Sequence, residues 1–152
     1  MNNLPLLKES LLPRIDGMQK NLALLEKFGK MPIEEFEKDE ILDRVQHNLR
    51  LVLEGVFNIT SHILARIPGA RETEYKRMAR KLGEIGVVEK KFAETVLVEI
   101  AGYRNRLTHF YAEIKATELH QICQTRLQDI EAFLTAIKKL LADPGKFGLS
   151  VE

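Results

Sequence analysis

The sequence has a single cysteine, no long hydrophobic run and almost no excess of charge of either sign in 152 residues. One thiol, that of Cys123, excludes an internal disulfide and a thiolate zinc cluster, so a disulfide-built secreted domain and a zinc finger are ruled out. No segment approaches the roughly 18 uncharged apolar residues of a membrane span, and the first leucine-rich run carries Lys8 and Glu9 rather than the pattern of an export signal. We therefore expect a cytoplasmic protein without membrane contact.

The charge balance restricts the kinds of partner. Lys and Arg total 23 and Asp and Glu total 22, so the formal net charge is +1. Such a chain has no overall attraction for nucleic acid or acidic membrane, and an anionic partner must be bound by a local cluster. Phosphate-loop, dinucleotide, zinc-protease and nucleophile-elbow motifs are also absent, and no carboxylates show metal-ligand spacing. We expect no metal and no bound cofactor.

Apolar residues recur instead at helical spacing along almost the whole chain. The clearest stripes are Leu42, Val45, Leu49, Val52, Val56, Ile59 and Ile63 in the second quarter, and Leu119, Cys123, Leu127, Ile130, Leu134, Ile137 and Leu141 near the end. Together with capping and turn residues they predict helices over 13–28, 39–66, 72–82, 89–108 and 117–141, with Asp39 capping the second. The fold class is therefore all-α, an up-and-down bundle of four main helices plus a short one, in a single domain spanning 1–152 with a mobile tail over 143–152.

One segment, 103–111, is far more polar than packing requires. It holds two arginines, an amide, a hydroxyl, an imidazole and two phenols beside a core-facing stripe. Arginine matches phosphate oxygens with a planar charged fork, and histidine exchanges protons near neutral pH. With these groups a ribose 2′-hydroxyl could attack the neighbouring phosphorus without a metal, Arg104 stabilising the developing charge and leaving a 2′,3′-cyclic phosphate.

Helix geometry complicates this chemistry. Arg104 and His109 are five residues apart, so on a regular helix they point roughly 140° away from each other. Three arrangements remain open: the helix frays or bends near Thr108, the long arginine wraps round the helix, or a second copy of the chain supplies part of the site across a two-fold axis.

The run 104–111 resembles the Arg-x4-His-x-Tyr signature of HepT-like proteins, the toxins of HepT/MntA toxin-antitoxin systems in the HEPN superfamily. The resemblance extends over about 33–141, although Thr108 stands where an aliphatic residue is commoner. It implies a dimeric helical bundle, a metal-independent endoribonuclease with Arg104 and His109 catalytic and Asn105 supporting, and inactivation when an MntA-like nucleotidyltransferase antitoxin transfers AMP from ATP to Tyr111. An adduct there would repel RNA phosphates.

Plainer interpretations accompany several of these residues. Arg106 and the basic run Lys76, Arg77 and Arg80 are possible RNA contacts, but such runs usually form a solvated face. We take Tyr103 and Phe110 as core or dimer-interface aromatics rather than base-stacking ones, Cys123 as a small buried residue and His47, His62 and His120 as unconnected with a metal. As a whole, the chain could alternatively be a non-catalytic helical binding subunit of a nucleotidyltransferase.

Overall fold

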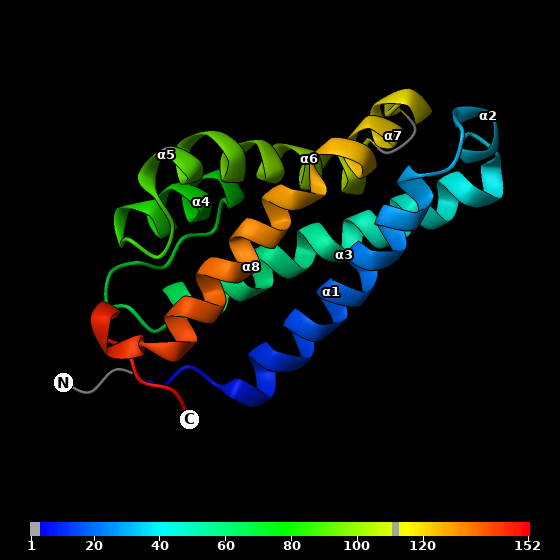
Figure 1. Cartoon of the computed structure of the whole chain (residues 1–152). Coiled ribbons are helices and arrows are strands. Elements are labelled where there is room, and N and C mark those ends of the chain that lie inside the picture. Colours follow the sequence, from blue (N-terminus) through cyan, green and yellow to red (C-terminus); the bar gives the residue numbers. More distant parts are fainter. Residues whose placement is uncertain (1–3, 111–112) are drawn as a thin grey trace.

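Two long helices, α1 (Lys8–Gly29) and α3 (Asp39–Leu64), lie side by side and form the base of the molecule (Figure 1). The short α2 (Ile33–Phe36) connects them. The structure is a computed structural model that describes residues 4–110 and 113–152. Within these residues the regular secondary structure is helical, apart from one isolated β-bridge. The predicted all-α bundle is therefore confirmed.

The helix α3 follows its predicted apolar stripe closely. It has 26 residues and begins at Asp39, the residue expected just ahead of it as a cap. Six of the seven predicted inward residues are buried, and Leu42, near the start, is half-buried. The helices α1, α4 (Tyr75–Glu84) and α6 (Val98–His109) all pack on α3. Glu54, Phe57 and Asn58 of α3 line one of the hollows described below.

The predicted helix over 89–108 is present but contains a π-helical turn. It consists of α5 (Lys90–Phe92), the π turn η1 (Ala93–Leu97) and α6 (Val98–His109), and it packs against α4 (Tyr75–Glu84). A π turn adds one residue to the helical repeat and so rotates the buried face. Ala93 and Leu97 are consequently buried, whereas Phe92 and Val96, which the spacing placed inward, are only half-buried.

The last helical region is not one helix, as the spacing predicted, but two. The helices α7 (Ala116–Thr125) and α8 (Leu127–Ala142) are separated at Arg126, whose backbone has φ −114° and ψ −4°. The apolar period continues across this break, which is why the sequence did not reveal it. Figure 1 shows α8 crossing the bundle, with α7 at the end where α2 also lies.

Both ends of the chain differ from expectation. The first helix begins at Lys8 rather than near Pro13, which lies inside it on the exposed side. The start of this helix is anchored to α3, because the Leu7 amide, just before the helix, donates to Nε2 of His62 at 3.1 Å. The tail over 143–152, expected to be mobile, is packed: it forms the 3-10 turn η3 (Pro144–Phe147), buries Leu149 and pairs Val151 with Leu6 in a parallel bridge.

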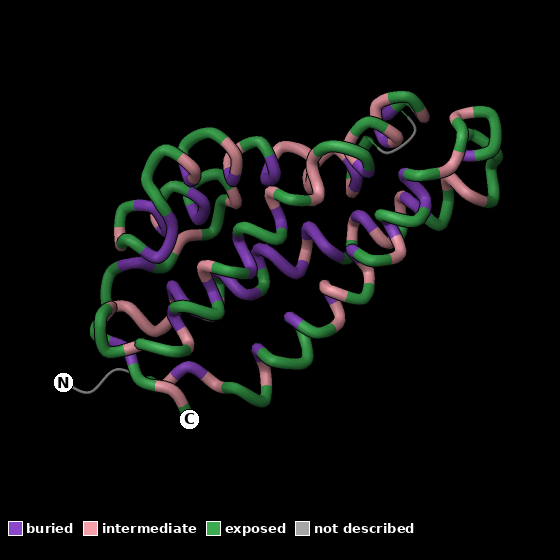
Figure 2. The backbone as a smooth tube through the Cα atoms, viewed as in Figure 1, coloured by how far each residue is buried: buried purple, intermediate pink, exposed green. Residues whose placement is uncertain are grey.

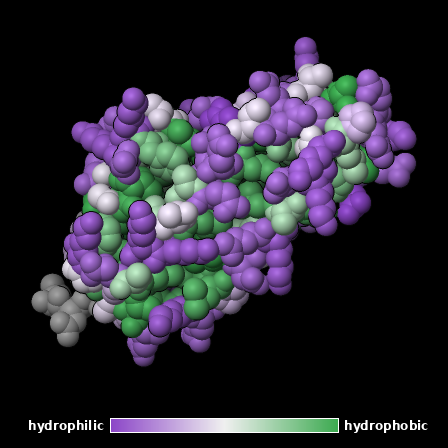
Figure 3. All heavy atoms as spheres, in the orientation of Figure 1, coloured by the Kyte–Doolittle hydropathy of each residue, from purple (hydrophilic) through white to green (hydrophobic). Residues whose placement is uncertain are grey.

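The buried apolar side chains form one contiguous cluster, to which all the long helices contribute. Figure 2 marks the buried residues in purple along the backbone. On the face shown in Figure 3, hydrophilic side chains cover most of the surface and apolar atoms appear in seams between them. In the described parts of the chain, no helix combines the length and apolar character needed to cross a bilayer.

Candidate active site

The polar segment identified in the sequence lies on the last turns of α6. Arg104 and Asn105 are half-buried, whereas His109 is the final helical residue and is exposed. Tyr111, the predicted AMP acceptor, lies outside the described residues. Four of the five residues predicted in this segment therefore lie on α6, namely Arg104, Asn105, Arg106 and His109. Their surroundings differ.

The geometry of α6 excludes one of the three ways in which Arg104 and His109 could be brought together. The helix is regular up to His109, and the hydroxyl of Thr108 donates to the Arg104 carbonyl oxygen at 2.9 Å. Only at Phe110 does the backbone leave helical angles, with φ −135° and ψ 31°. Fraying before His109 is thus not observed, and among the described contacts none joins Arg104 to His109. Two of the arrangements therefore remain: an Arg104 side chain that wraps round the helix, and a second copy of the chain that supplies part of the site.

Arg104 faces a small hollow where α3, α4 and α6 meet. The hollow is lined by Glu54, Phe57, Asn58, Tyr75 and Arg104. The guanidinium carbon lies over the ring of Tyr75, 4.3 Å from its centroid, and Nη1 makes a long 3.4 Å contact with Oδ1 of Asn105. The buried Nε has no hydrogen-bond partner among the described residues. Since a buried donor without a partner is costly, this group is suited to an incoming acceptor.

His109 occupies a different, more open position. Its ring lies edge-on to that of Phe110, with centroids 6.3 Å apart, and both residues are exposed. Phe110 is 55% exposed, an unusual extent for a phenylalanine, so of the two roles expected for it, core or dimer interface, the core role is wrong. An imidazole at this place is accessible to a large substrate.

Arg106, unlike Arg104, forms an ion pair with a carboxylate among the described residues. Its two terminal nitrogens donate to the two carboxylate oxygens of Glu118 at 3.1 and 3.0 Å, and the Tyr103 hydroxyl donates to the same carboxylate at 2.8 Å. Hydrogen bonding by Arg106 keeps the pKa of Glu118 below its usual value, whereas burial, and then Glu118, raise the pKa of Tyr103. Sequence analysis did not single out Glu118, which lies on α7, twelve residues after Arg106.

The predicted basic run lies on the exposed side of α4, immediately after Tyr75. Lys76, Arg77 and Arg80 are all exposed, and Arg77 pairs loosely with Glu74 at 3.5 Å. No ion pair within 4–110 and 113–152 includes Lys76 or Arg80. The run thus extends from the Arg104 hollow along the surface, which fits either an RNA path or a solvated face.

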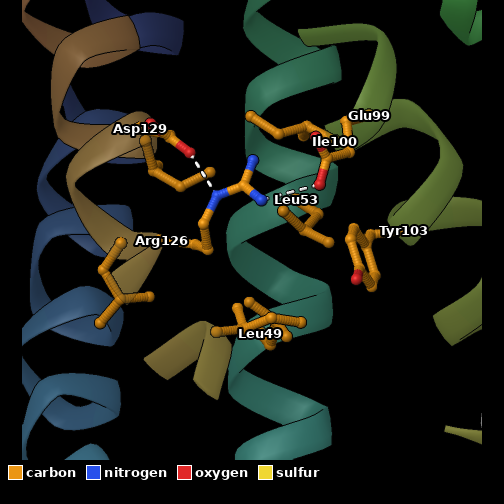
Figure 4. Close-up of a pocket in the computed structure, with 10 residues that line it drawn as sticks. Leu49, Leu53, Glu99, Ile100, Tyr103, Arg126 and Asp129 are labelled. Atoms are coloured by element: carbon orange, nitrogen blue, oxygen red, sulfur yellow. Dashed lines mark hydrogen bonds and ion pairs between the residues drawn. The ribbon is translucent and has the colours of Figure 1, made fainter. Parts of the chain in front are cut away.

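A separate hollow between α3, α6 and α8 is mainly apolar (Figure 4). Leu49, Leu53 and Ile100 line it, and Arg126 reaches from the α7–α8 break to Glu99 and Asp129, both at 2.8 Å. These two hydrogen bonds raise the pKa of Arg126. Arg126, Glu99 and Asp129 are thus paired with one another at the break between α7 and α8, and we assign this hollow a structural role.

Two of the three histidines outside the motif, His62 and His120, have structural surroundings, whereas His47 is exposed on α3. Nε2 of His62 receives the Leu7 amide, and Nε2 of His120 lies 2.7 Å from the Met31 carbonyl oxygen. Cys123 is buried, and burial raises the pKa of its thiol to about 12, in agreement with its expected role as a small apolar residue. Groups of three or more His, Cys, Asp or Glu suited to a metal are not found among the described residues.

Comparison with known proteins relates this geometry to a family. A tRNA nuclease HepT of Aphanizomenon flos-aquae is 23% identical over 132 residues, which cover 84% of this chain and 87% of that protein. The fold is similar to that of a tri-AMPylated HEPN toxin of Shewanella oneidensis in complex with an MNT antitoxin. The TM-score is 0.75 and the identity 20%, over 85% of this chain and 96% of that chain.

The family comparison covers most of the helices. Its profile, described as ribonuclease HepT-like, matches residues 18–137, from within α1 to within α8, and so begins earlier than the 33 inferred from the sequence. The matched region includes Arg104, Asn105 and His109 on α6 as well as the α3 and α4 residues around them. The chain therefore belongs to the ribonuclease HepT-like family.

Proposed function

We propose that the protein is an RNA endonuclease, the toxin of a toxin-antitoxin pair, whose chemistry is carried by Arg104 and His109. The observation that supports this most directly is the state of Arg104: a guanidinium with a buried, unpartnered Nε at a hollow, five residues before an exposed histidine, in a HepT-like fold. The relative named as a tRNA nuclease makes tRNA the first substrate to test.

The proposed reaction is transesterification within the RNA strand. The 2′-oxygen of a ribose attacks the adjacent phosphorus, the bond from phosphorus to the 5′-oxygen of the next nucleotide breaks, and a 2′,3′-cyclic phosphate remains. Arg104 donates to the non-bridging oxygens as their charge develops, and His109 transfers a proton from the 2′-hydroxyl or to the leaving oxygen. Asn105, whose Oδ1 contacts Nη1 of Arg104, orients that guanidinium. These groups supply the chemistry without a metal.

The active form is a homodimer in this proposal. Since Arg104 and His109 diverge on a regular α6, the second copy of the chain brings His109 of one protomer towards Arg104 of its partner. Mixing Arg104→Ala and His109→Ala chains tests this arrangement, because the mixed dimer then holds one intact site. Activity should return to about a quarter of the wild-type value. If the mixture stays as inactive as either variant alone, the shared site is wrong.

Regulation is proposed to act through Tyr111. A nucleotidyltransferase partner of MNT type would join AMP to the phenol oxygen, releasing pyrophosphate from ATP, and the solved relative is an AMPylated toxin in complex with such an antitoxin. The adduct would add negative charge two residues from His109, where it would repel RNA phosphates. The enzyme itself needs no cofactor, and both reactions belong in the cytoplasm, where RNA and ATP are available.

The first test is cleavage of tRNA and of DNA of the same sequence. We expect the RNA alone to be cleaved and Arg104→Ala to abolish cleavage. Arg44→Ala is the matched control, because it removes an arginine stacked on Phe28 at 5.0 Å, outside the hollow. Equal cleavage of RNA and DNA, or an active Arg104→Ala protein, would exclude the proposed mechanism.

The second test concerns the partner. After co-expression with the nucleotidyltransferase, intact-mass measurement should show one or more AMP units that are absent from Tyr111→Phe. A stable complex with neither adduct nor ribonuclease activity would instead favour the alternative, a non-catalytic binding subunit of the nucleotidyltransferase.

A further inference from the structure

Two arginines of α6, only two residues apart, differ in what their guanidinium groups contact. Both terminal nitrogens of Arg106 are occupied by the carboxylate of Glu118. Arg104 has no ion pair among the described residues, although Glu54 lines the same hollow, and its close neighbour is instead the ring of Tyr75. A carboxylate partner would fill the donor edge of a guanidinium, whereas an aromatic ring covers its face and leaves the N–H groups in the plane free.

The ring of Tyr75 is itself held in place from the core. Tyr75 is the first residue of α4 and is half-buried, and Phe57 of α3 meets its ring in an edge-to-face arrangement with centroids 5.1 Å apart and an interplanar angle of 61°. Phe57 is 2% exposed, so it is fixed by the surrounding core. The contacts therefore run from the core helix α3 through Tyr75 to the guanidinium on α6.

We propose that Tyr75 is a positioning residue of the ribonuclease: its ring fixes the guanidinium of Arg104 at the hollow without pairing its N–H groups with a carboxylate, so that they can bind an RNA phosphate. The inference rests on the proposed function, because Arg104 is taken as the group that meets the phosphate. It assigns Tyr75 a role beyond packing. It also assigns the ring, and not the phenol hydroxyl, as the part that acts.

Preorganisation explains why a ring suits this purpose. A free arginine side chain samples many rotamers, and holding it in one costs entropy that phosphate binding would have to supply. A ring stacked on the guanidinium reduces that cost before RNA arrives, without neutralising the charge. Loss of the ring should therefore weaken both phosphate binding and transition-state stabilisation, and only through Arg104.

The test compares Tyr75→Phe, which keeps the ring, with Tyr75→Leu, which does not. On cleavable RNA we expect Tyr75→Phe to keep most of the activity and Tyr75→Leu to lower kcat/KM about fivefold to tenfold. Tyr75→Met, which fills more of the space of the ring, serves in place of the leucine variant if that protein does not fold. Thermal unfolding measured beside each assay identifies a loss that comes from instability.

A double-mutant cycle separates positioning from packing. The Kd of a fully 2′-O-methylated RNA, which cannot be cleaved by this chemistry, is measured for wild type, Tyr75→Leu, Arg104→Ala and the double variant. Tyr75→Leu should weaken binding in the wild-type background and have no further effect once Arg104 is alanine. The same weakening in both backgrounds, or activity of Tyr75→Leu equal to wild type, would overturn the inference. If wild type itself cleaves no RNA, the proposed function fails instead.

Discussion

Arg106 and Glu118 form a bidentate ion pair between the end of α6 and the start of α7, with N–O distances of 3.0 and 3.1 Å. Tyr103 adds a third hydrogen bond to the same carboxylate. The pair lies across the connection that follows His109, so it fixes the end of the helix that carries the candidate site. It also gives Arg106 a structural role. Arg106 could contact RNA only through N–H groups that do not donate to Glu118.

Removing the charge of Glu118 should loosen this connection. We expect Glu118→Gln to lower the free energy of unfolding by about 1 kcal/mol, because a partly exposed bidentate pair contributes modestly. The loss should shrink in high salt. Urea unfolding at two ionic strengths measures it, with Glu131→Gln as the control, since that exposed residue has no ion pair in the described part of the chain. Equal stability of the two variants would show that the pair contributes nothing.

Stability should fall as the pH drops from about 6.5 towards 4. Burial, then the nearby charges of Arg66 and Arg14, lower the pKa of His62 from 6.5 to about 4. Its neutral ring receives the Leu7 amide in the folded state, whereas the unfolded chain takes up a proton already near pH 6.5. The stabilisation is thus fully present above pH 6.5 and is lost on acidification.

The effect of His62 is measured by comparing the free energy of unfolding of wild type with that of His62→Gln. Between pH 7 and pH 5 wild type should lose about 1 kcal/mol more than His62→Gln, a value reduced because the ring is partly exposed. Parallel unfolding free energies for the two proteins over this range would contradict the assigned role of His62.

Two glycines of α1 should respond to alanine in opposite directions. A Cβ on Gly29 would lie 2.8 Å from the carbonyl oxygen of Cys123, a backbone atom that cannot easily move, so Gly29→Ala should cost about 1–3 kcal/mol. A Cβ on Gly17 would meet nothing within 4 Å, and Gly17→Ala should raise stability by about 0.5–1 kcal/mol. Thermal unfolding of both variants tests the close contact of α1 with α7. A neutral Gly29→Ala would mean that these helices are farther apart.

The single thiol offers a measure of global opening. Cys123 is buried and burial raises its pKa to about 12, so the native protein should not react with a thiol reagent at pH 8. Reaction should become complete in denaturant, with one thiol per chain. Rapid labelling of the folded protein would place Cys123 at an accessible surface and contradict the packing of α7.

The features that the sequence predicted are those that depend on neighbours along the chain. The stripe of α3 follows directly from apolar spacing, and the motif on α6 is contiguous. At the break, Arg126 pairs with Glu99, 27 residues earlier, and in the packed tail Val151 pairs with Leu6. Such contacts between distant segments leave no local pattern.

The same distinction applies to the site. Arg104, Asn105 and His109 stand out because they are polar residues crowded on one apolar-faced helix. Tyr75 and Glu118 belong to other helices, where one resembles a core aromatic and the other a surface acid. Only the packing of α4 and α7 against α6 gives them their partners.

Catalysis by His109 is tested by incubating the purified protein with labelled RNA in EDTA, beside His109→Ala, and analysing the new ends. Intact mass first confirms that the protein carries no adduct on Tyr111. We predict 2′,3′-cyclic phosphate ends from wild type and none from the variant, with helicity unchanged. No cleavage by the unmodified wild type, or equal cleavage by His109→Ala, would contradict a ribonuclease that acts through His109.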